Sequence, residues 1–121
     1  MTDESDRAAG VLLGLACGDA LGRPVEFETP GSIEREYGRL TEMVGHGTHG
    51  KPAGTVTDDT DLALCLARSL VARDGFDPGD AAERFVAWLD AGPFDVGLMT
   101  RDAIAALRDG TPPDEAGQRV W

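Results

Sequence analysis

Residues 57–73 read TDDTDLALCLARSLVAR and predict a long helix with an acidic start. Apolar side chains cover almost its whole circumference, apart from Asp61, Arg68 and the acidic first turn. A helix that is apolar nearly all round is normally central and buried. We therefore expect residues 58–73 to form a central helix of the fold, with Thr57 as a favourable N-cap.

A second helix is predicted over residues 5–22 (SDRAAGVLLGLACGDALG), with Ser5 or Asp6 as its cap. One face of this helix is apolar except for an aspartate near its centre, Asp19. The residues on that face are Ala8, Leu12, Leu15, Ala16 and Asp19.

Four glycines form another ridge of the same helix at intervals of four residues: Gly10, Gly14, Gly18 and Gly22. Each glycine inside a helix costs up to about 1 kcal/mol relative to alanine, so the ridge indicates a demand for close approach. Tight helix packing is the simpler interpretation. Approach of a ligand is the alternative.

The segment between these helices, residues 23–56, is a long Gly/Pro-rich loop with one short helical candidate, Ile33–Tyr37 after Ser32. Loops of this length inside a small domain are usually functional or disordered.

Three more helices are predicted in the rest of the chain. Gly75 is a natural C-cap for the helix before it, and Asp77-Pro78 is typical of a helix start. That next helix would end at Gly92-Pro93 and place four side chains inward: Ala82, Phe85, Val86 and Leu89. Another is predicted from Thr100 to Arg108, stopping at Gly110, with Ala103, Ile104 and Leu107 on one side, and a last one begins near Pro113. No stretch shows strand alternation, so the predicted fold class is all-α, in a single domain over residues 1–121.

The charge balance excludes several classes of partner. The chain has 22 acidic and 11 basic side chains and a net charge of −11. Nucleic acids and anionic membranes need clustered Lys and Arg, so neither is expected as a partner. The acidic N-terminus is unlike a secretory signal, and the apolar runs are expected to be too interrupted to span a bilayer. We expect a cytoplasmic protein in which Cys17 and Cys65 are buried free thiols.

The acidic helix start, Thr57-Asp58-Asp59-Thr60-Asp61, allows two interpretations. Carboxylates in a first turn are favoured by the helix dipole, so the cluster could be a cap and nothing more. However, adjacent carboxylates on an otherwise apolar helix repel one another unless a cation intervenes. Oxygen ligands select hard ions such as Mg²⁺, Ca²⁺ or Mn²⁺. One cluster rarely completes a coordination shell, and the sequence supplies no obvious second set of donors.

Three other motifs are weaker. Residues 45–51 (GHGTHGK) fit the start of a phosphate-binding Walker loop, but Pro52 stands where Ser or Thr is needed. The aspartates of the acidic start partly match isoprenoid synthases, but Leu62 replaces their third acid. His46 and His49 could form a metal pair, although two imidazoles in a glycine-rich loop are more often solvated.

Three motifs occur in order: GDALG at 18–22, PVE at 24–26 and GTVTDDT at 54–60, before an apolar helix. Together they resemble the amino-terminal part of the ADP-ribosylglycohydrolase family. The segments 84–88 and 95–110 also fit the helical course of that family, so the resemblance covers nearly the whole chain.

The resemblance implies a multi-helix orthogonal bundle whose cleft holds two divalent ions, Mg²⁺ or Mn²⁺. The implied reaction is hydrolysis of the bond between C1 of the distal ribose of ADP-ribose and an acceptor, in an ADP-ribosylated protein or a small ADP-ribosyl conjugate. Carried over to this chain, Thr57, Asp58 and Asp59 match the first half of the metal cluster. Glu26 matches the acidic residue beside the scissile bond, as general acid or base. Asp19 is expected to orient the motif through hydrogen bonds to the backbone.

The family's second acidic motif, Asp-x-Asp-Thr, does not occur in this sequence. The resemblance therefore predicts an incomplete front half of the domain, whose catalysis needs the missing carboxyl-terminal half. Such a chain would expose an apolar face and self-associate through it. The alternatives are a non-catalytic helical module that binds ADP-ribose or a partner, and an inactive truncated fragment in which the acidic turn is only a cap.

Overall fold

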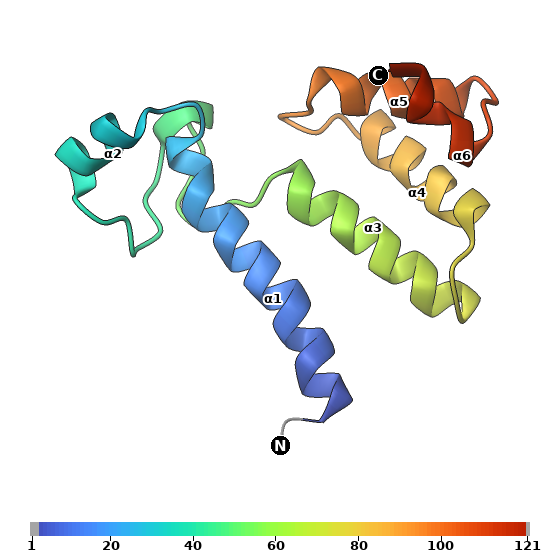
Figure 1. Ribbon diagram of the computed structural model, residues 1–121, viewed down its shortest axis with the longest axis horizontal. Helices are drawn as coiled ribbons and strands as arrows, with labels where there is room; N and C mark the ends of the chain where they lie inside the picture. Colours follow the sequence, from blue (N-terminus) through green and yellow to red (C-terminus); the bar gives the residue numbers. More distant parts are fainter. Residues whose placement is uncertain (1–2, 121) are drawn as a thin grey trace. The chain divides into compact units, whose positions relative to one another are not determined.

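The computed structural model describes residues 3–120, and over this range the chain forms helices and turns with no strand (Figure 1). The expected all-α class is therefore confirmed. The chain divides into two compact units, residues 1–60 and residues 61–121. The helix predicted at 58–73 is observed as α3 (Asp58–Arg73), and its first three residues belong to the first unit.

The first unit begins with α1 (Glu4–Gly22), which starts one residue before the predicted range and continues directly into the 3-10 turn η1 (Arg23–Val25). Its cap is Asp3, whose carboxylate accepts a hydrogen bond from the backbone N–H of Asp6 at 2.7 Å. The prediction of Ser5 or Asp6 as cap was wrong by two or three residues, because another side-chain oxygen acceptor, that of Asp3, precedes both in the sequence.

Most of α1 is exposed, and Ala20 is its one buried residue. Apart from the neighbouring backbone of α1 itself, no heavy atom of the first unit lies within 4 Å of a Cβ placed on any of the four ridge glycines, so no tight packing within this unit requires them. Cys17 is a free thiol but exposed, which corrects the expectation of burial, whereas Cys65 is half-buried. By length and composition alone, Glu4–Val25 would also suffice to cross a membrane, contrary to the expectation, although core helices of soluble proteins meet the same test.

The Gly/Pro-rich segment contains α2 (Pro30–Tyr37) and a second 3-10 turn, η2 (Gly47–His49). Helix α2 begins three residues earlier than predicted. Thr29 caps it by accepting a hydrogen bond from Ser32 N at 3.2 Å, and Pro30 occupies the first helical position. Residues 23–56 are thus a loop with short helical pieces.

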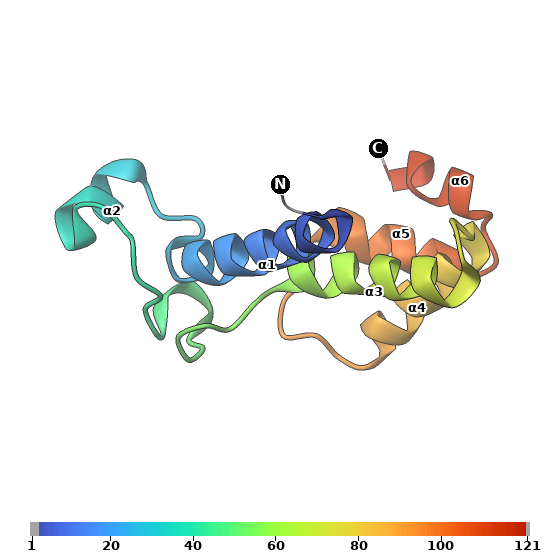
Figure 2. The ribbon, with the colours of Figure 1, turned by 90° about the horizontal axis from the view of Figure 1, so that it is seen from below.

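The second unit holds the rest of α3 and three further helices, α4 (Pro78–Asp90), α5 (Leu98–Arg108) and α6 (Pro113–Ala116), with a last turn η3 (Gln118–Val120). Helix α4 has the predicted cap, because Asp77 accepts a hydrogen bond from Asp80 N at 3.0 Å. Helix α5 starts two residues before the predicted Thr100. Helices α4 and α5 lie against one another (Figure 2).

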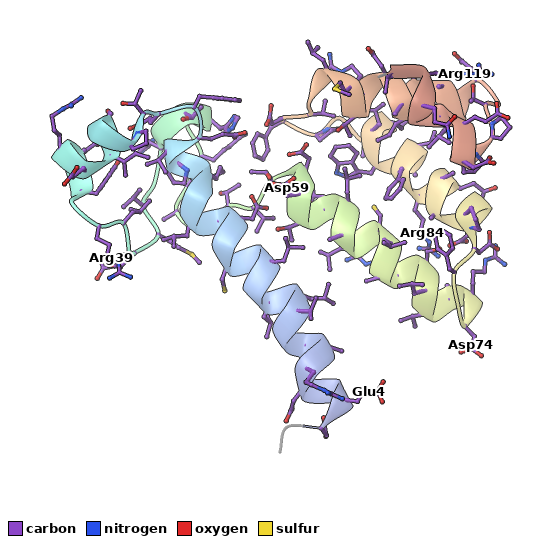
Figure 3. All side chains as sticks on the ribbon, in the orientation of Figure 1. Glu4, Arg39, Asp59, Asp74, Arg84 and Arg119 are labelled. Carbon is purple, nitrogen blue, oxygen red and sulfur yellow. The ribbon has the colours of Figure 1, made fainter. Side chains whose placement is uncertain are left out.

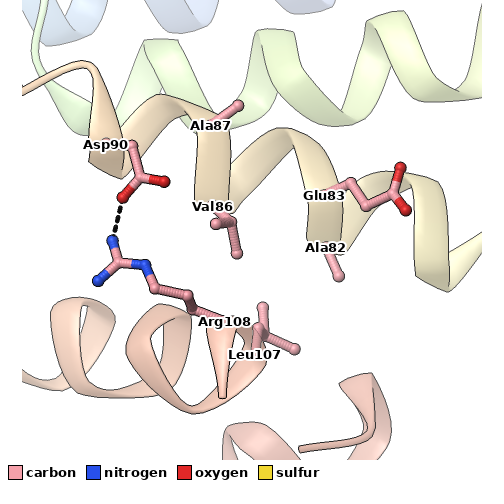
Figure 4. A pocket seen from close by; sticks show the side chains of 7 residues that line it. All are labelled: Ala82, Glu83, Val86, Ala87, Asp90, Leu107 and Arg108. Carbon is pink, nitrogen blue, oxygen red and sulfur yellow. Dashed lines mark hydrogen bonds and ion pairs between the residues drawn. The ribbon is translucent and has the colours of Figure 1, made fainter. Parts of the chain in front are cut away.

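The buried apolar residues of this unit are Ala81, Ile104 and Ala116. A groove of about 380 Å³ runs between α4 and α5, with an ion pair of Asp90 and Arg108 at its side (Figure 4). Asp80 accepts hydrogen bonds from Arg84 at 2.7 Å and Arg73 at 3.0 Å, and these cations hold its pKa well below the usual range.

Helix α3 was expected to be buried, but only Thr60 and Ser69 are buried, residues 61–67 are half-buried, and Val71 is 85% exposed. Its end is well defined. Asp74 adopts a left-handed conformation with φ 52°, and Gly75 N donates to Leu70 O at 3.1 Å. This bond closes a Schellman turn with Asp74, rather than the predicted Gly75, at the first left-handed position.

Candidate functional site

Asp19 joins the last turns of α1 to the start of α3. Its carboxylate accepts hydrogen bonds from Thr57 N at 2.8 Å, Thr57 Oγ1 at 2.8 Å, Thr60 N at 3.3 Å and Thr60 Oγ1 at 2.6 Å. Both threonines are buried. The expectation that Asp19 orients the acidic motif through the backbone is confirmed, and the carboxylate in the apolar face of α1 has its partners.

These hydrogen bonds keep Asp19 ionised. Burial by itself would raise the pKa of Asp19, but the bonds from Thr60 and Thr57 outweigh it and leave the pKa below 3.8. Four hydrogen bonds stabilise this carboxylate in its charged form. Asp19 is therefore a positioning group in this arrangement.

The contact with Asp19 also fixes the hydroxyl of Thr57. Its proton is donated to Asp19 Oδ1, and Thr57 Oγ1 accepts the backbone N–H of Asp59 at 3.2 Å, as the predicted N-cap requires. A hydroxyl oxygen has two lone pairs. With its proton held by Asp19, the oxygen of Thr57 keeps one lone pair for a further partner.

The acidic start of α3 divides into structural and pocket-facing residues. Thr60 is buried, and its hydroxyl donates a hydrogen bond to Asp19. Asp61 accepts a hydrogen bond from the indole N–H of Trp88 at 3.0 Å within the second unit. Asp59 is exposed at the first turn (Figure 3). The helix thus uses Thr60 and Asp61 for packing and leaves the side chain of Asp59 exposed.

A buried arginine holds the loop that leads into this helix. Arg23 is 2% exposed, and its guanidinium donates to four backbone carbonyls. Nε donates to Thr55 O at 3.1 Å, Nη1 to His46 O at 3.0 Å, and Nη2 to Lys51 O and Pro52 O, each at 3.2 Å. Burying a charge is costly unless it is hydrogen-bonded, and here the carbonyls of residues 46–55 supply those bonds.

A pocket of about 350 Å³ opens in the first unit beside these groups. Its lining residues come from the end of α1, from η1 and from the start of α3: Gly18, Asp19, Gly22, Arg23, Glu26, Thr57 and Asp59. The two ridge glycines, Gly18 and Gly22, contribute no side chain to their part of the pocket wall. The predicted catalytic residue Glu26 and the predicted metal ligands Thr57 and Asp59 therefore face one pocket.

Asp58 is not among the residues that line this pocket. The structure thus brings three of the four predicted site residues together. Glu26 and Thr57 line the same pocket although more than thirty positions separate them in the sequence.

Glu26 is held by the turn η2. Its Oε2 lies 2.6 Å from His49 Nε2, and its backbone carbonyl accepts the hydroxyl of Thr48 at 2.6 Å. The expectation that His49 is a solvated loop histidine was wrong, because its side chain is only 12% exposed. The imidazole binds a carboxylate.

The donor chemistry of the pocket fits a hard divalent cation. Thr57 offers a hydroxyl oxygen with its proton already directed to Asp19, and Asp59 offers an exposed carboxylate at the same helix start. Oxygen donors of these kinds suit Mg²⁺ or Mn²⁺.

The contacts of three residues of the site were not predicted from the sequence: Arg23, Thr48 and His49. Arg23 carried no signal, because an arginine between two turn-forming residues is usually solvated. His49 was noticed as a metal candidate, but its spacing from Glu26 gave no indication of a contact. The loop that brings them together has no periodic pattern.

Comparison with known proteins places the chain in a family. The model described as ADP-ribosylglycohydrolase matches residues 1–121. The ADP-ribosyl-[dinitrogen reductase] glycohydrolase of Rhodospirillum rubrum is 46% identical over 107 residues, which cover 88% of this chain and 36% of that protein. The ADP-ribosylarginine hydrolase Tri1 of Pseudomonas putida (strain GB-1) is 42% identical over 113 residues, which cover 87% of this chain and 29% of that protein.

A solved structure described as an ADP-ribosylglycohydrolase-related protein complex has the same fold over the shared part. It matches with a TM-score of 0.74 at 42% identity, covering 89% of this chain and 35% of that one. The chain therefore spans about a third of the length of these relatives. The family match over all 121 residues and the two identities above 40% agree: the chain belongs to the ADP-ribosylglycohydrolase family.

Proposed function

We propose that these residues provide part of the active site of a metal-dependent hydrolase that cleaves the glycosidic bond between ADP-ribose and an acceptor. The acceptor is a protein side chain, as the names of the ADP-ribosyl-[dinitrogen reductase] glycohydrolase and the ADP-ribosylarginine hydrolase suggest, or the acceptor group of a small ADP-ribosyl conjugate. The observation that carries the proposal is the pocket in which Glu26, Thr57 and Asp59 meet.

In the proposed reaction the bond between C1 of the distal ribose and the acceptor atom breaks, and the oxygen of a water molecule bonds to C1. One proton leaves the water and one proton reaches the acceptor. Cleavage of this kind passes through an oxocarbenium-like state, which needs proton transfer and negative charge nearby. Glu26 is the proposed proton-transfer group, as general acid or base, because it lines the pocket and lies in the segment after η1.

Thr57 and Asp59 are the proposed metal ligands that line the pocket. Asp58, from the same turn but outside the pocket lining, is the further ligand that the family resemblance implies. A bound divalent ion would supply charge compensation and orient ribose hydroxyls. Asp19 fixes the Thr57 hydroxyl so that its oxygen faces a ligand as an acceptor. The Asp-x-Asp-Thr sequence that would complete the set does not occur among the 121 residues.

The test is release of ADP-ribose from a protein ADP-ribosylated on arginine, followed by chromatography with Mg²⁺, with Mn²⁺ and with a chelator. With a polypeptide that carries these 121 residues together with an Asp-x-Asp-Thr segment, we expect release that depends on the cation and that falls at least 10²-fold in Glu26→Gln. Glu28→Gln is the matched control, because Glu28 lies two residues away, accepts the hydroxyl of Ser32 and does not line the pocket.

Three results would separate this proposal from its alternatives. Binding of ADP-ribose in calorimetry without any release would favour the non-catalytic module. Neither binding nor release would favour a chain in which the acidic turn is only a cap. Equal losses in Glu26→Gln and Glu28→Gln would remove the proposed role of Glu26.

A further inference from the structure

The turn η2 (Gly47–His49) packs against η1 (Arg23–Val25), the segment that leads directly into Glu26. Gly47 has φ 64°, and a Cβ on it would lie 2.6 Å from Pro24 Cα, so the two turns meet backbone to backbone. Thr48 Oγ1 is 2.6 Å from Glu26 O and 3.3 Å from Pro24 O. Its single proton serves the nearer carbonyl, which fixes the backbone of Glu26.

The same turn also holds the side chain of Glu26. His49 Nε2 lies 2.6 Å from Glu26 Oε2, the short distance of a charge-assisted hydrogen bond. The side chain of His49 is 12% exposed and that of Glu26 is 39% exposed. The imidazole is therefore mostly enclosed, while the carboxylate remains accessible.

We propose that His49 is the positioning residue of Glu26: the imidazole holds Oε2 and leaves Oε1 as the oxygen that exchanges a proton with water or with the acceptor. This inference rests on the proposed role of Glu26 as the proton-transfer group. The proposal gives a role to His49, which is not one of the residues that line the pocket.

The two contacts with η2 orient the carboxylate of Glu26. A glutamate side chain has three rotatable bonds, and an accessible one samples many rotamers. The bond from Thr48 fixes the backbone and the bond from His49 fixes the far end of the carboxylate, so the remaining oxygen has a defined position. Proton transfer needs that definition, because small misplacements of a reacting group cost about 10²-fold in rate.

A purely structural histidine would tie the loop to Glu26 without affecting the reaction. The two roles differ in what they require of the side chain. Packing of the loop requires a ring of this size at position 49. Positioning requires a side-chain nitrogen at position 49 that binds the carboxylate of Glu26. His49→Phe keeps a ring and removes the nitrogen, and His49→Gln keeps a nitrogen donor of similar reach.

His46 offers a matched control three residues earlier. It is an exposed histidine in the same loop, and its φ of 62° and ψ of −114° lie outside the left-handed helical region, so histidine and asparagine are both strained there. His46→Asn therefore changes a loop histidine at a position where the side chain does not reach Glu26. Backbone amide shifts of residues 47–49 report whether the turn survives each substitution.

The first measurement is NMR relaxation of the Glu26 side chain in the full chain labelled with ¹³C-glutamate. We expect an ordered side chain in the unsubstituted protein and in His46→Asn, a mobile one in His49→Phe, and recovered order in His49→Gln. A Glu26 side chain that is equally ordered in His49→Phe, or mobile in the unsubstituted protein, would overturn the proposal.

The second measurement is the kinetics of ADP-ribose release by the same four variants, each in a polypeptide that also carries an Asp-x-Asp-Thr segment. We expect kcat to fall about 10²-fold in His49→Phe with KM changed less than threefold, and His49→Gln to recover at least part of kcat. A rise in KM at unchanged kcat would contradict positioning. If the unsubstituted protein releases no ADP-ribose, the proposed function fails, and the relaxation data still decide whether His49 orders Glu26.

Discussion

Asp19 and Thr57 are joined by two hydrogen bonds of 2.8 Å, one from the backbone N–H and one from the hydroxyl of the threonine. This pair connects the end of α1 to the start of α3 across 38 positions of sequence. It decides which way the Thr57 hydroxyl points, and it caps the helix that carries Asp59. The pocket depends on this contact before any ligand is present.

Replacing Asp19 by asparagine tests that connection. The amide group presents N–H donors to backbone and hydroxyl donors, so at least one bond from Thr57 or Thr60 is lost. We expect Asp19→Asn to lower the free energy of unfolding by about 2 kcal/mol, measured by urea denaturation. Asp6→Asn, in the exposed first turn of the same helix, should cost no more than about 0.5 kcal/mol. Equal effects at the two positions would contradict the account.

The pKa of Asp19 gives a pH dependence with a definite sign. The folded-state pKa lies below the unfolded value of 3.8, so the contribution of the carboxylate to stability is complete above that value. It is lost as pH falls through the folded pKa. We expect the stability difference between the unsubstituted protein and Asp19→Asn to be constant above about pH 5 and to shrink below pH 3.8. A difference that grows on acidification would show the opposite shift.

Arg23 is predicted to require its guanidinium group. Lysine keeps the charge but cannot reach four carbonyls in a planar fork. We expect Arg23→Lys to lower the free energy of unfolding by about 3 kcal/mol, because buried carbonyls and a buried charge lose partners. Arg39→Lys is the control, since Arg39 is exposed (Figure 3). Thermal unfolding that shifts equally in both variants would show that the clamp contributes nothing.

The contact between the two 3-10 turns can be isolated with a pair of glycines. Gly47 and Gly50 have nearly the same positive φ, 64° and 61°, so alanine carries a similar backbone cost of about 1 to 2 kcal/mol at each. Only Gly47 faces Pro24, whereas the space at Gly50 is open. We expect Gly47→Ala to be clearly less stable than Gly50→Ala in chemical denaturation. Indistinguishable variants would mean that the turns do not meet as described.

The sequence predicted the elements with a strong local signal. The period of residues 58–73 gave α3 with its exact ends, and Asp77-Pro78 gave the start of α4, because a cap and a proline act within one turn. Errors arose where neighbouring residues competed for one role. Asp3, Ser5 and Asp6 are all acceptable caps, and Thr29 and Ser32 both precede helical residues of α2.

The candidate site was predictable only in part, for a related reason. Thr57 and Asp59 share a helix turn, so their proximity follows from the sequence. The contacts of Arg23, Thr48 and His49 depend on the path of an irregular loop, which no periodicity specifies. Cys17 and Val71 were expected to be buried but are exposed. An apolar pattern indicates that a helix face favours burial, but it does not show which part of the chain packs against that face.

The central claim is that the oxygens of Thr57 and Asp59, beside Glu26, bind a divalent cation. Paramagnetic Mn²⁺ tests it directly, because amide NMR signals broaden according to their distance from the bound ion. At substoichiometric Mn²⁺ we expect the amides of residues 57–59 and Glu26 to broaden first, and the selectivity to disappear in Asp59→Asn. Broadening spread evenly over the 22 acidic side chains, or a pattern unchanged in Asp59→Asn, would contradict the account.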